Sequence, residues 1–244
     1  MIMDRNDKLK SPDQARSLRV IDLCTGTGCI PLLLHALLAP HFQHLEITGV
    51  DISSTALSLA QKNLAHNLQL GNLASNAATN IRFQRADVLG DGISDSIPSV
   101  EAILQTQLGA LPPAYDNGCD LLISNPPYIS QTEFRNGTTA RSVRRFEPKL
   151  ALVPPFSSGA EDCRPEDIFY HRILTLALKW KAKITVLECG DIFQANRVLA
   201  LHKRLAGESG HFSVEVWPSQ EQDLAENGFH ATDGSRGVII RRLS

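Results

Sequence analysis

The chain has 244 residues and a nearly balanced charge, and these properties already exclude several classes of protein. It contains 24 Lys plus Arg against 26 Asp plus Glu, a formal net charge of -2 and a hydrophobic fraction of 43%. This balance excludes a polycation that holds nucleic acid by net charge alone, and the apolar content argues against a disordered chain. No apolar run reaches the roughly 18 to 20 residues that cross a bilayer, so no membrane partner is expected. The length suits one α/β domain.

The cysteines and the first residues show no sign of a metal site or a targeting segment. The five cysteines are odd in number, and no two are separated by two residues as in zinc knuckles. We therefore expect free thiols in a reducing compartment and no bound metal. Residues 1–17 are polar and of mixed charge, and we expect an N-terminal tail without the pattern of a secretory or organelle signal.

Short β-rich runs alternate with longer helical stretches. Strands are expected at 18–23, 45–50, 81–83, 120–124, 184–188, 212–216 and 238–241. Helices are expected at 29–38, from Ser53 or Ser54 to about residue 66, and at 168–179 and 192–205. This alternation predicts a mostly parallel sheet with helices on both faces and right-handed crossovers. The last two strands are joined without a clear full helix, so an antiparallel last strand is expected.

Two segments interrupt this alternation of strands and helices. Residues 90–118 are rich in Gly, Pro, Ser and Asp, with one weak helical stretch at 100–108, and we expect a surface insertion too short for its own core. Residues 131–155 are polar and show no clear period. They carry five basic residues against two acidic ones, a local net charge of +3. This charge suits either the docking of an acidic protein surface or a solvated loop with internal ion pairs.

Three features fall at the carboxyl ends of predicted strands, where parallel α/β sheets bind their ligands. The first is the turn Asp22-Leu-Cys-Thr-Gly-Thr-Gly28, which leads from the first strand into a helix. Gly26 and Gly28 let the backbone turn tightly and let a ligand approach, and the helix start offers free N–H groups. Pro31 replaces the third glycine of a dinucleotide fingerprint, so this turn alone is weak evidence for a cofactor loop.

The second feature is a pair of aspartates at the ends of the next two strands. Asp51 follows the second strand, where a carboxylate accepts hydrogen bonds from ribose hydroxyls or caps the following helix. Asp87 follows the third strand, where it accepts a bond from the exocyclic amine of adenine or serves as an ordinary turn residue. With the glycine turn in place, the ligand role is favoured for both.

The third feature is the sequence Asn125-Pro-Pro-Tyr128 after an apolar strand. The prolines restrict the backbone and bias Asn125 to extended geometry. The side-chain oxygen of Asn125 and the carbonyl of Pro126 can then converge on one planar NH2 group, with Tyr128 lying flat against it. The pattern predicts a site for a planar amine or amide nitrogen.

Together these motifs resemble the class I methyltransferases that use S-adenosylmethionine, and more narrowly the HemK/PrmC family of protein-(glutamine-N5) methyltransferases. The segments 143–152, with Phe-Glu-Pro, and 169–173 and 187–194 are similar to later landmarks of that family. The resemblance covers about Leu18 to Arg242. The sequence around Cys24 and Cys29 is similar to that of the family's fungal, mitochondrial branch. The family usually carries glycine where Cys24 stands. It also places a small helical domain before the first strand, and this domain is expected to be absent here, with 18–244 as the catalytic domain.

The resemblance implies a class I methyltransferase Rossmann-like fold, S-adenosyl-L-methionine as cofactor and a class I peptide release factor as protein substrate. The methylated atom would be the side-chain nitrogen of the glutamine in the Gly-Gly-Gln motif. A monomer is expected, in mitochondria by resemblance or else in the cytoplasm. The cofactor-binding residues would be Asp22, Thr25, Gly26, Thr27, Gly28, Asp51, Ile52, Asp87, Val88 and Asn125. The catalytic residues would be Asn125, Pro126 and Tyr128, and the substrate-binding residues would be these three with Pro127 and Glu147.

Three other readings compete with this one. A nucleic-acid amino-methyltransferase acting on adenine N6 or guanine N2 uses the same Asn-Pro-Pro-Tyr motif to bind its target amine. Such an enzyme normally shows a basic face or an added recognition domain. A nicotinamide oxidoreductase would need the third glycine and leaves Asn125 to Tyr128 unexplained. A non-catalytic protein that keeps the fold as a binding module would have no need of the intact Asn-Pro-Pro-Tyr motif.

Overall fold

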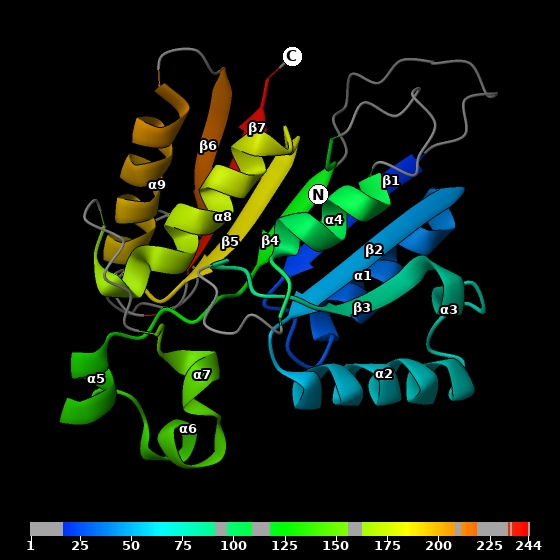
Figure 1. Cartoon of the computed structure of the whole chain (residues 1–244), viewed down its shortest axis with the longest axis horizontal. Coiled ribbons are helices and arrows are strands. Elements are labelled where there is room, and N and C mark those ends of the chain that lie inside the picture. Colours follow the sequence, from blue (N-terminus) through cyan, green and yellow to red (C-terminus); the bar gives the residue numbers. More distant parts are fainter. Residues whose placement is uncertain are drawn as a thin grey trace.

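The chain forms a twisted central sheet with helices on both faces (Figure 1). The computed structural model describes residues 17–90, 97–108, 118–155, 163–207, 211–218, 234 and 236–243, without the side chains of 105–108. The expected N-terminal tail and most of the expected insertion at 90–118 therefore lie outside the described residues. The helical stretch expected within that insertion is present as α4 (Val100–Leu108).

Seven strands of the described residues pair in the order β3-β2-β1-β4-β5-β7-β6. They are β1 (Ser17–Leu23), β2 (His44–Asp51), β3 (Ile81–Arg85), β4 (Leu121–Ser124), β5 (Ile184–Cys189), β6 (Phe212–Trp217) and β7 (Arg236–Arg242). The first five are parallel, and β7 runs antiparallel to both β5 and β6. The direction of strand succession reverses between β1 and β4. This topological switch point is where an open α/β sheet binds its ligands.

Helices connect and cover these strands. They are α1 (Cys29–Leu38), α2 (Ser54–Gln69), α3 (Ala77–Asn80), α4, α5 (Gln131–Asn136), α6 (Arg141–Phe146), α7 (Lys149–Leu152), α8 (Ile168–Lys179) and α9 (Ile192–Ala206). Two 3-10 turns, η1 (Ala39–His41) and η2 (Pro165–Asp167), precede β2 and α8. In Figure 1, α4 and α8 lie in front of the sheet and α1 behind it.

The core consists of two apolar clusters, one on each face of the sheet. Neighbouring residues of β1 point to opposite faces, so Val20 packs in one cluster and Ile21 in the other. The Ile21 cluster contains the apolar sides of α4, α8 and α9, and the Val20 cluster contains Leu32 of α1 and Leu73. Because both faces are covered, the central strands read as continuous apolar runs in the sequence.

The predicted mostly parallel sheet with helices on both faces and an antiparallel last strand is confirmed, and most predicted elements are present. The bounds of α1, α4 and α8 agree with the sequence prediction, and the other strands and helices differ by one to three residues. Ser53 caps α2, since its side chain accepts a hydrogen bond from the Ala56 N–H. Residues 131–155, which show no period in the sequence, form α5, α6 and α7, and α3 is also additional. Helices of four to six residues are too short to display a helical repeat.

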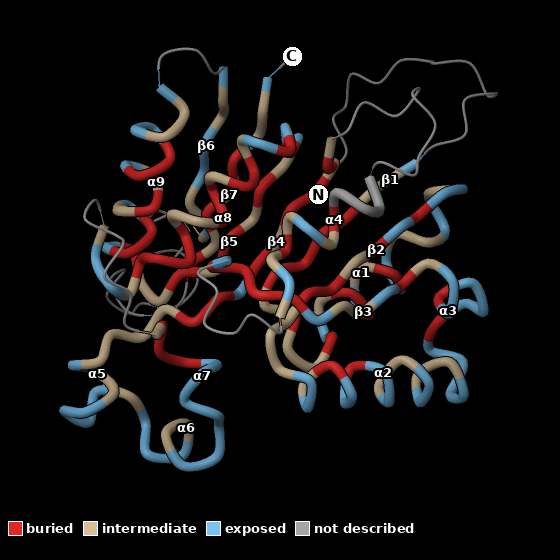
Figure 2. The backbone as a smooth tube through the Cα atoms, in the orientation of Figure 1, coloured by how far each residue is buried: buried red, intermediate tan, exposed pale blue. Residues whose placement is uncertain are grey.

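The helices α5, α6 and α7 form a small layer outside the main sheet-and-helix layers (Figure 2). We call them the α5–α7 layer. Neither α5 nor α6 contains a buried residue, and Leu152 is buried in α7. The Ser130 side chain and the Glu133 carboxylate form a capping box that begins α5. Only α5 begins with a side-chain cap, since α6 and α7 have none, and with Leu152 as its one buried helical residue the layer has no core of its own.

No described helix combines the length and the apolar character needed to cross a bilayer. The described residues also contain no cluster of three or more His, Cys, Asp or Glu that could hold a metal ion. All five cysteines are free thiols, as expected from the sequence.

Candidate active site

The strand register brings the three predicted features to one edge of the sheet. Leu23, the last residue of β1, pairs with Ser124 of β4 on one side and with Val50 of β2 on the other. The glycine turn after β1 therefore begins between Asn125 and Asp51. Ser124 reinforces this arrangement, because its hydroxyl donates to the Leu23 carbonyl over 2.6 Å.

Asp51 holds the glycine turn and the start of α2 at the same time. Its Oδ2 accepts a hydrogen bond of 2.8 Å from the Gly26 N–H, and its Oδ1 accepts one of 2.8 Å from the Ser53 N–H. The turn itself is closed by the Gly28 N–H, which donates to the Thr25 carbonyl over 3.0 Å. Ser53 rather than Asp51 is the helix cap. A carboxylate oxygen has more than one acceptor site, so both functions are compatible with a ligand at Asp51.

Position 28 requires glycine for two reasons, the space left by neighbouring side chains and the backbone conformation. It has a φ of +79°, and a Cβ added there would lie 2.7 Å from Cζ of the Phe83 ring. Gly26 also has a positive φ of +55°, but a Cβ there would meet no atom within 4 Å. Cys24, where the resembled family usually has glycine, adopts a left-handed φ of +62°. The backbone conformation of the turn thus explains the family's preference, and Cys24 is accommodated under strain.

Asp22 is a fully buried carboxylate behind this turn. Neither of its oxygens, nor Oγ1 of Thr25, has a hydrogen-bond partner within the described residues. Burial raises the pKa of Asp22 to about 7; the nearby Thr25 hydroxyl opposes this shift and the charge of Asp51 adds to it. An unpartnered buried carboxylate at a strand end suits a ligand that brings positive charge or N–H donors.

The remaining predicted cofactor residues lie on the same edge. Thr27 and Ile52 offer carbonyls that accept bonds from Asn63 and Arg85, respectively. Asp87 is buried, and its Oδ1 accepts a bond of 3.0 Å from the Leu89 N–H. The following residues named in the prediction are therefore brought together at the ends of β1, β2, β3 and β4: Asp22, Thr25, Gly26, Thr27, Gly28, Asp51, Ile52, Asp87, Val88 and Asn125.

The Asn-Pro-Pro-Tyr loop leaves β4 at the switch point. Asn125 is exposed, whereas Pro126 and Pro127 are buried. The loop is fixed at its far end, where the Ile129 N–H donates to the Leu152 carbonyl of α7 over 2.9 Å. The Tyr128 hydroxyl donates to Oε1 of Glu188 at the end of β5, over 3.2 Å. The polar Asn125 side chain is thus presented on a loop held at both ends.

A cleft of about 960 Å³ lies between the α5–α7 layer and the segment that joins β5 to α9. Tyr128 and Glu147 both line it, so the structure brings these two predicted substrate residues to one cavity. The cleft also contains charges of both signs, among them Arg164, Glu166 and Arg197. Asn125 is not among its lining residues.

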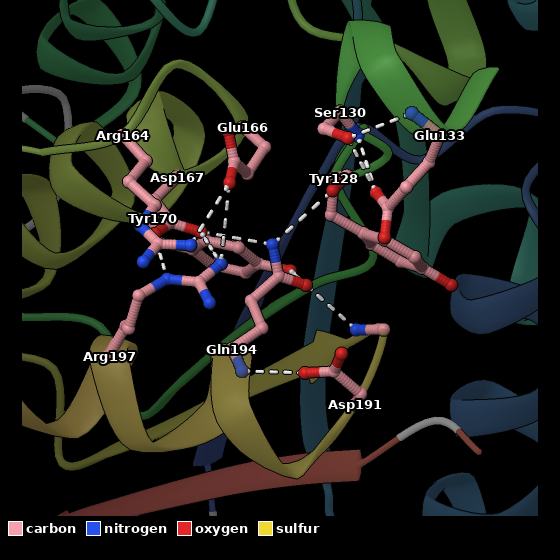
Figure 3. A network of polar contacts seen from close by, with 11 residues as sticks. Tyr128, Ser130, Glu133, Arg164, Glu166, Asp167, Tyr170, Asp191, Gln194 and Arg197 are labelled. Atoms are coloured by element: carbon pink, nitrogen blue, oxygen red, sulfur yellow. Dashed lines mark hydrogen bonds and ion pairs between the residues drawn. The ribbon is translucent and has the colours of Figure 1, made fainter. Parts of the chain in front are cut away.

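Sequence reasoning did not assign a role to Glu188 or Gln194. Figure 3 shows Gln194 at the centre of a polar network with Tyr128, Tyr170, Asp167 and Arg197. The only signal in the sequence was the segment from Leu187 to Gln194, which resembled a family landmark without indicating which residues contact which. The contact between Gln194 and Tyr128 joins residues 66 positions apart.

Curated proteins of similar sequence include glutamine methyltransferases. A probable MRF1 mitochondrial N(5)-glutamine methyltransferase, mtq1 of Schizosaccharomyces pombe, is 37% identical over 239 residues, which is 97% of this chain and 63% of the relative. The release factor glutamine methyltransferase of Chlorobaculum tepidum is 34% identical over 143 residues, 59% of this chain and 38% of the relative. The chain is a homologue of the release factor glutamine methyltransferases.

These glutamine methyltransferase relatives differ in the substrate that their names give. The ribosomal protein uL3 glutamine methyltransferase of Bradyrhizobium diazoefficiens is 32% identical over 135 residues, 55% of this chain and 30% of the relative. In all three cases the chain spans less than two thirds of the relative's length. No protein-family model matches the chain.

Solved structures with the same fold include the human METTL16 catalytic domain in complex with a MAT2A 3'UTR hairpin. The TM-score is 0.54 at 16% identity, over 93% of this chain and 65% of that one. At this identity the similarity establishes the class I methyltransferase fold and nothing about the substrate.

Proposed function

We propose that the chain is the catalytic domain of a methyltransferase that modifies the side-chain nitrogen of a glutamine in a peptide release factor. One observation carries the proposal: Ser124 pairs with Leu23, so the Asn-Pro-Pro-Tyr loop and the glycine turn leave adjacent strands side by side. The first motif suits a planar amide and the second suits a nucleoside cofactor. Homology to glutamine methyltransferases supports the same chemistry.

The described residues fit S-adenosylmethionine as the cofactor. Asp51 would accept bonds from the ribose hydroxyls, and Asp87 would accept one from the adenine amine. The buried and unpartnered carboxylate of Asp22 suits the positive end of the amino-acid moiety. When bound, S-adenosylmethionine supplies an electrophilic methyl group on a sulfonium centre.

Asn125 and Pro126 would bind and orient the substrate amide. An amide nitrogen is a poor nucleophile because its lone pair is delocalised into the carbonyl. The side-chain oxygen of Asn125 and the carbonyl of Pro126 would each accept one N–H bond, and these bonds strengthen as the nitrogen gains positive charge. Positioning two bound reactants in this way is worth up to about 7–11 kcal/mol in favourable cases. The proton would leave to water after the methyl transfer.

The cleft next to Tyr128 would accept the polypeptide around the target glutamine. It contains Glu147, which could bond the substrate backbone, and it opens beside the basic α5–α7 layer. A release factor is favoured over ribosomal protein uL3 because the relative that matches 97% of this chain is named for MRF1. The same name supports a mitochondrial location, and we propose that the chain acts as a monomer.

A labelled-methyl assay tests the substrate. The chain is incubated with methyl-labelled S-adenosylmethionine and, separately, with a class I release factor, ribosomal protein uL3, tRNA, rRNA or DNA. We expect label in the release factor and its loss when the Gly-Gly-Gln glutamine is replaced by asparagine. Label in nucleic acid alone would overturn the proposal, and label in uL3 alone would reassign the substrate.

The variant Asn125→Ala tests the chemistry. We expect kcat to fall about 100- to 1,000-fold, the usual effect of removing one group that stabilises developing charge. The affinity for S-adenosylmethionine, measured by calorimetry, should change much less. Gln69→Ala, an exposed position at the end of α2, is the control and should keep wild-type kcat. Near-normal methylation by Asn125→Ala would show that the assignment of Asn125 is wrong.

A further inference from the structure

The side chain of Gln194 joins three separate segments of the chain through four hydrogen bonds (Figure 3). Its Oε1 accepts a bond of 2.8 Å from the Gly190 N–H and a long one of 3.4 Å from the Tyr170 hydroxyl, whose single proton is shared with the Glu188 carbonyl at 2.8 Å. Its Nε2 donates to the Tyr128 carbonyl over 3.3 Å and to Oδ1 of Asp167 over 3.0 Å. The side chain is buried, and all the hydrogen-bonding capacity of a primary amide is used.

Gln194 is itself held in place from two sides. Its backbone N–H donates to Oδ1 of Asp191, the residue that caps α9, over 2.7 Å. Asp167, which receives one of its side-chain bonds, is paired with Arg197 through bonds of 2.6 and 3.0 Å. A bidentate charged pair of this kind is strong and geometrically specific. Gln194 is therefore held in one position and can hold the groups that it contacts in place.

The Asn-Pro-Pro-Tyr loop needs such an external support. Pro126 and Pro127 have no N–H, so the middle of the loop cannot be held by its own backbone donors. The carbonyl of Tyr128 is bound by Gln194. The ring of Tyr128 also packs against Gly190, where an added Cβ would lie 3.2 Å from Cδ2 and Cε2 of the ring. Gln194 thus fixes both the loop and the glycine against which the tyrosine lies.

We propose that Gln194 is a positioning residue for methyl transfer: by binding the Tyr128 carbonyl and the Gly190 N–H it sets the direction in which Asn125 and the Pro126 carbonyl face the amide nitrogen. The inference rests on the proposed function. Gln194 also lines the cleft beside Tyr128, but its proposed effect on methyl transfer runs through the Tyr128 carbonyl and the Gly190 N–H and not through the reacting atoms. A small displacement of reacting groups by a remote change can cost about 100-fold in rate.

Two variants separate the donor and acceptor bonds of Gln194. Gln194→Met keeps the length of the side chain and a similar helix propensity, but it removes all four bonds. Gln194→Glu keeps the two acceptor bonds, to Gly190 and Tyr170, and loses the two donor bonds, to Tyr128 and Asp167. Gln69→Met, at an exposed position of α2, is the matched control.

Amide hydrogen exchange measures the network independently of activity. We expect the Gly190 amide to exchange at least about tenfold faster in Gln194→Met than in the wild type, because its hydrogen-bond acceptor is gone. In Gln194→Glu it should stay protected, while the Ile129 amide in the adjoining loop exchanges faster. Unchanged exchange in both variants would overturn the proposal.

Steady-state kinetics with the release factor test the positioning itself. We expect kcat of Gln194→Met to fall 10- to 100-fold, with the dissociation constant for S-adenosylmethionine within about twofold of the wild-type value. Gln69→Met should match the wild type. Wild-type kcat in Gln194→Met would overturn the proposal. A joint loss of cofactor affinity and cooperative unfolding would also overturn it, because it would show a general structural role.

The pH dependence of Gln194→Glu provides a readout that a merely structural role would not move. A glutamic acid at this buried position should have a raised pKa, since burial disfavours its charge and Asp167 is near, although Arg197 partly offsets Asp167. Tyr128, Tyr170 and Asp191 complete its surroundings. Protonation at lower pH restores one donor, so kcat relative to wild type should rise as the pH falls from 8 to 6. A constant ratio would overturn the proposal.

Wild-type activity separates the two levels of inference. If the wild-type chain methylates no release factor, the proposed function fails and the positioning role fails with it, while hydrogen exchange still reports whether the network exists. If the wild type is active and the Gln194 variants behave like it, the positioning role alone fails.

Discussion

The cofactor edge and the α5–α7 layer differ in what holds them in place. The cofactor edge is formed by the ends of four paired strands, and its key side chains are fixed by hydrogen bonds to neighbouring strands. The α5–α7 layer consists of helices of four to six residues, mostly exposed, which contact the rest through Leu152 and the loop after Tyr128. The difference indicates that the strand ends are held more firmly than the α5–α7 layer, and the loop from Asn125 to Tyr128 joins the two.

The largest expected effect is at Asp22 on the cofactor edge. Its pKa in the folded state is raised from 3.8 to about 7, so the fold favours the protonated form and the wild type loses stability as the pH rises through this range. At pH 8 the cost approaches about 4 kcal/mol, taken at 1.4 kcal/mol per pKa unit. Asp22→Asn should therefore be more stable than the wild type in urea unfolding at pH 8, with a difference that shrinks toward pH 4. The same variant should bind S-adenosylmethionine more weakly. Equal stabilities at pH 8 would contradict the prediction.

An intermediate effect is expected at the two glycines of the turn. Gly28→Ala combines a left-handed φ with overlap on the Phe83 ring and should destabilise the chain by about 2–3 kcal/mol in denaturant unfolding. Gly26→Ala has the same kind of φ but open space, so its cost should be about 1–2 kcal/mol. Gly137→Ala, at the end of α5, has a φ of +94° and open space, and it serves as the control outside the cofactor edge. Equal losses at Gly28 and Gly26 would show that the Phe83 contact is unimportant.

The smallest effects are expected on the basic surface of the α5–α7 layer. Arg135 and Arg141 are exposed and form no ion pair with other residues of the described part of the chain. Replacing either by alanine should raise KM for the release factor two- to fivefold at low salt, about 0.5–1 kcal/mol, and leave kcat unchanged. The effect should fade in high salt. Lys62→Ala on α2 is the control, and an equal rise of KM there would remove any special role of the α5–α7 layer.

The two regions also differ in how far the sequence predicts them. The glycine turn, Asp51 and Asn125 follow directly after apolar strands, and parallel strand ends meet at one edge, so local patterns predicted their proximity. The Gln194 network depends on contacts of Gln194 with residues far from it in the chain, such as Tyr128 and Asp167, which no local pattern encodes. The helices α5 to α7 have only four to six residues, which is too short for a helical repeat to be visible in the sequence, and only α5 has a side-chain cap, at Ser130.

The antiparallel strand β7 has a consequence for how this protein is made. Cys189 and Glu188, which lead into Gly190, pair with Arg236 and Gly237, which are synthesised much later. While β7 is still unmade, one side of β5 has no partner strand, and that exposed edge is open to wrong pairings. During translation, the ends of β1 to β4 would therefore be made before β7 can pair with β5, the strand that leads to Gly190 beside Tyr128.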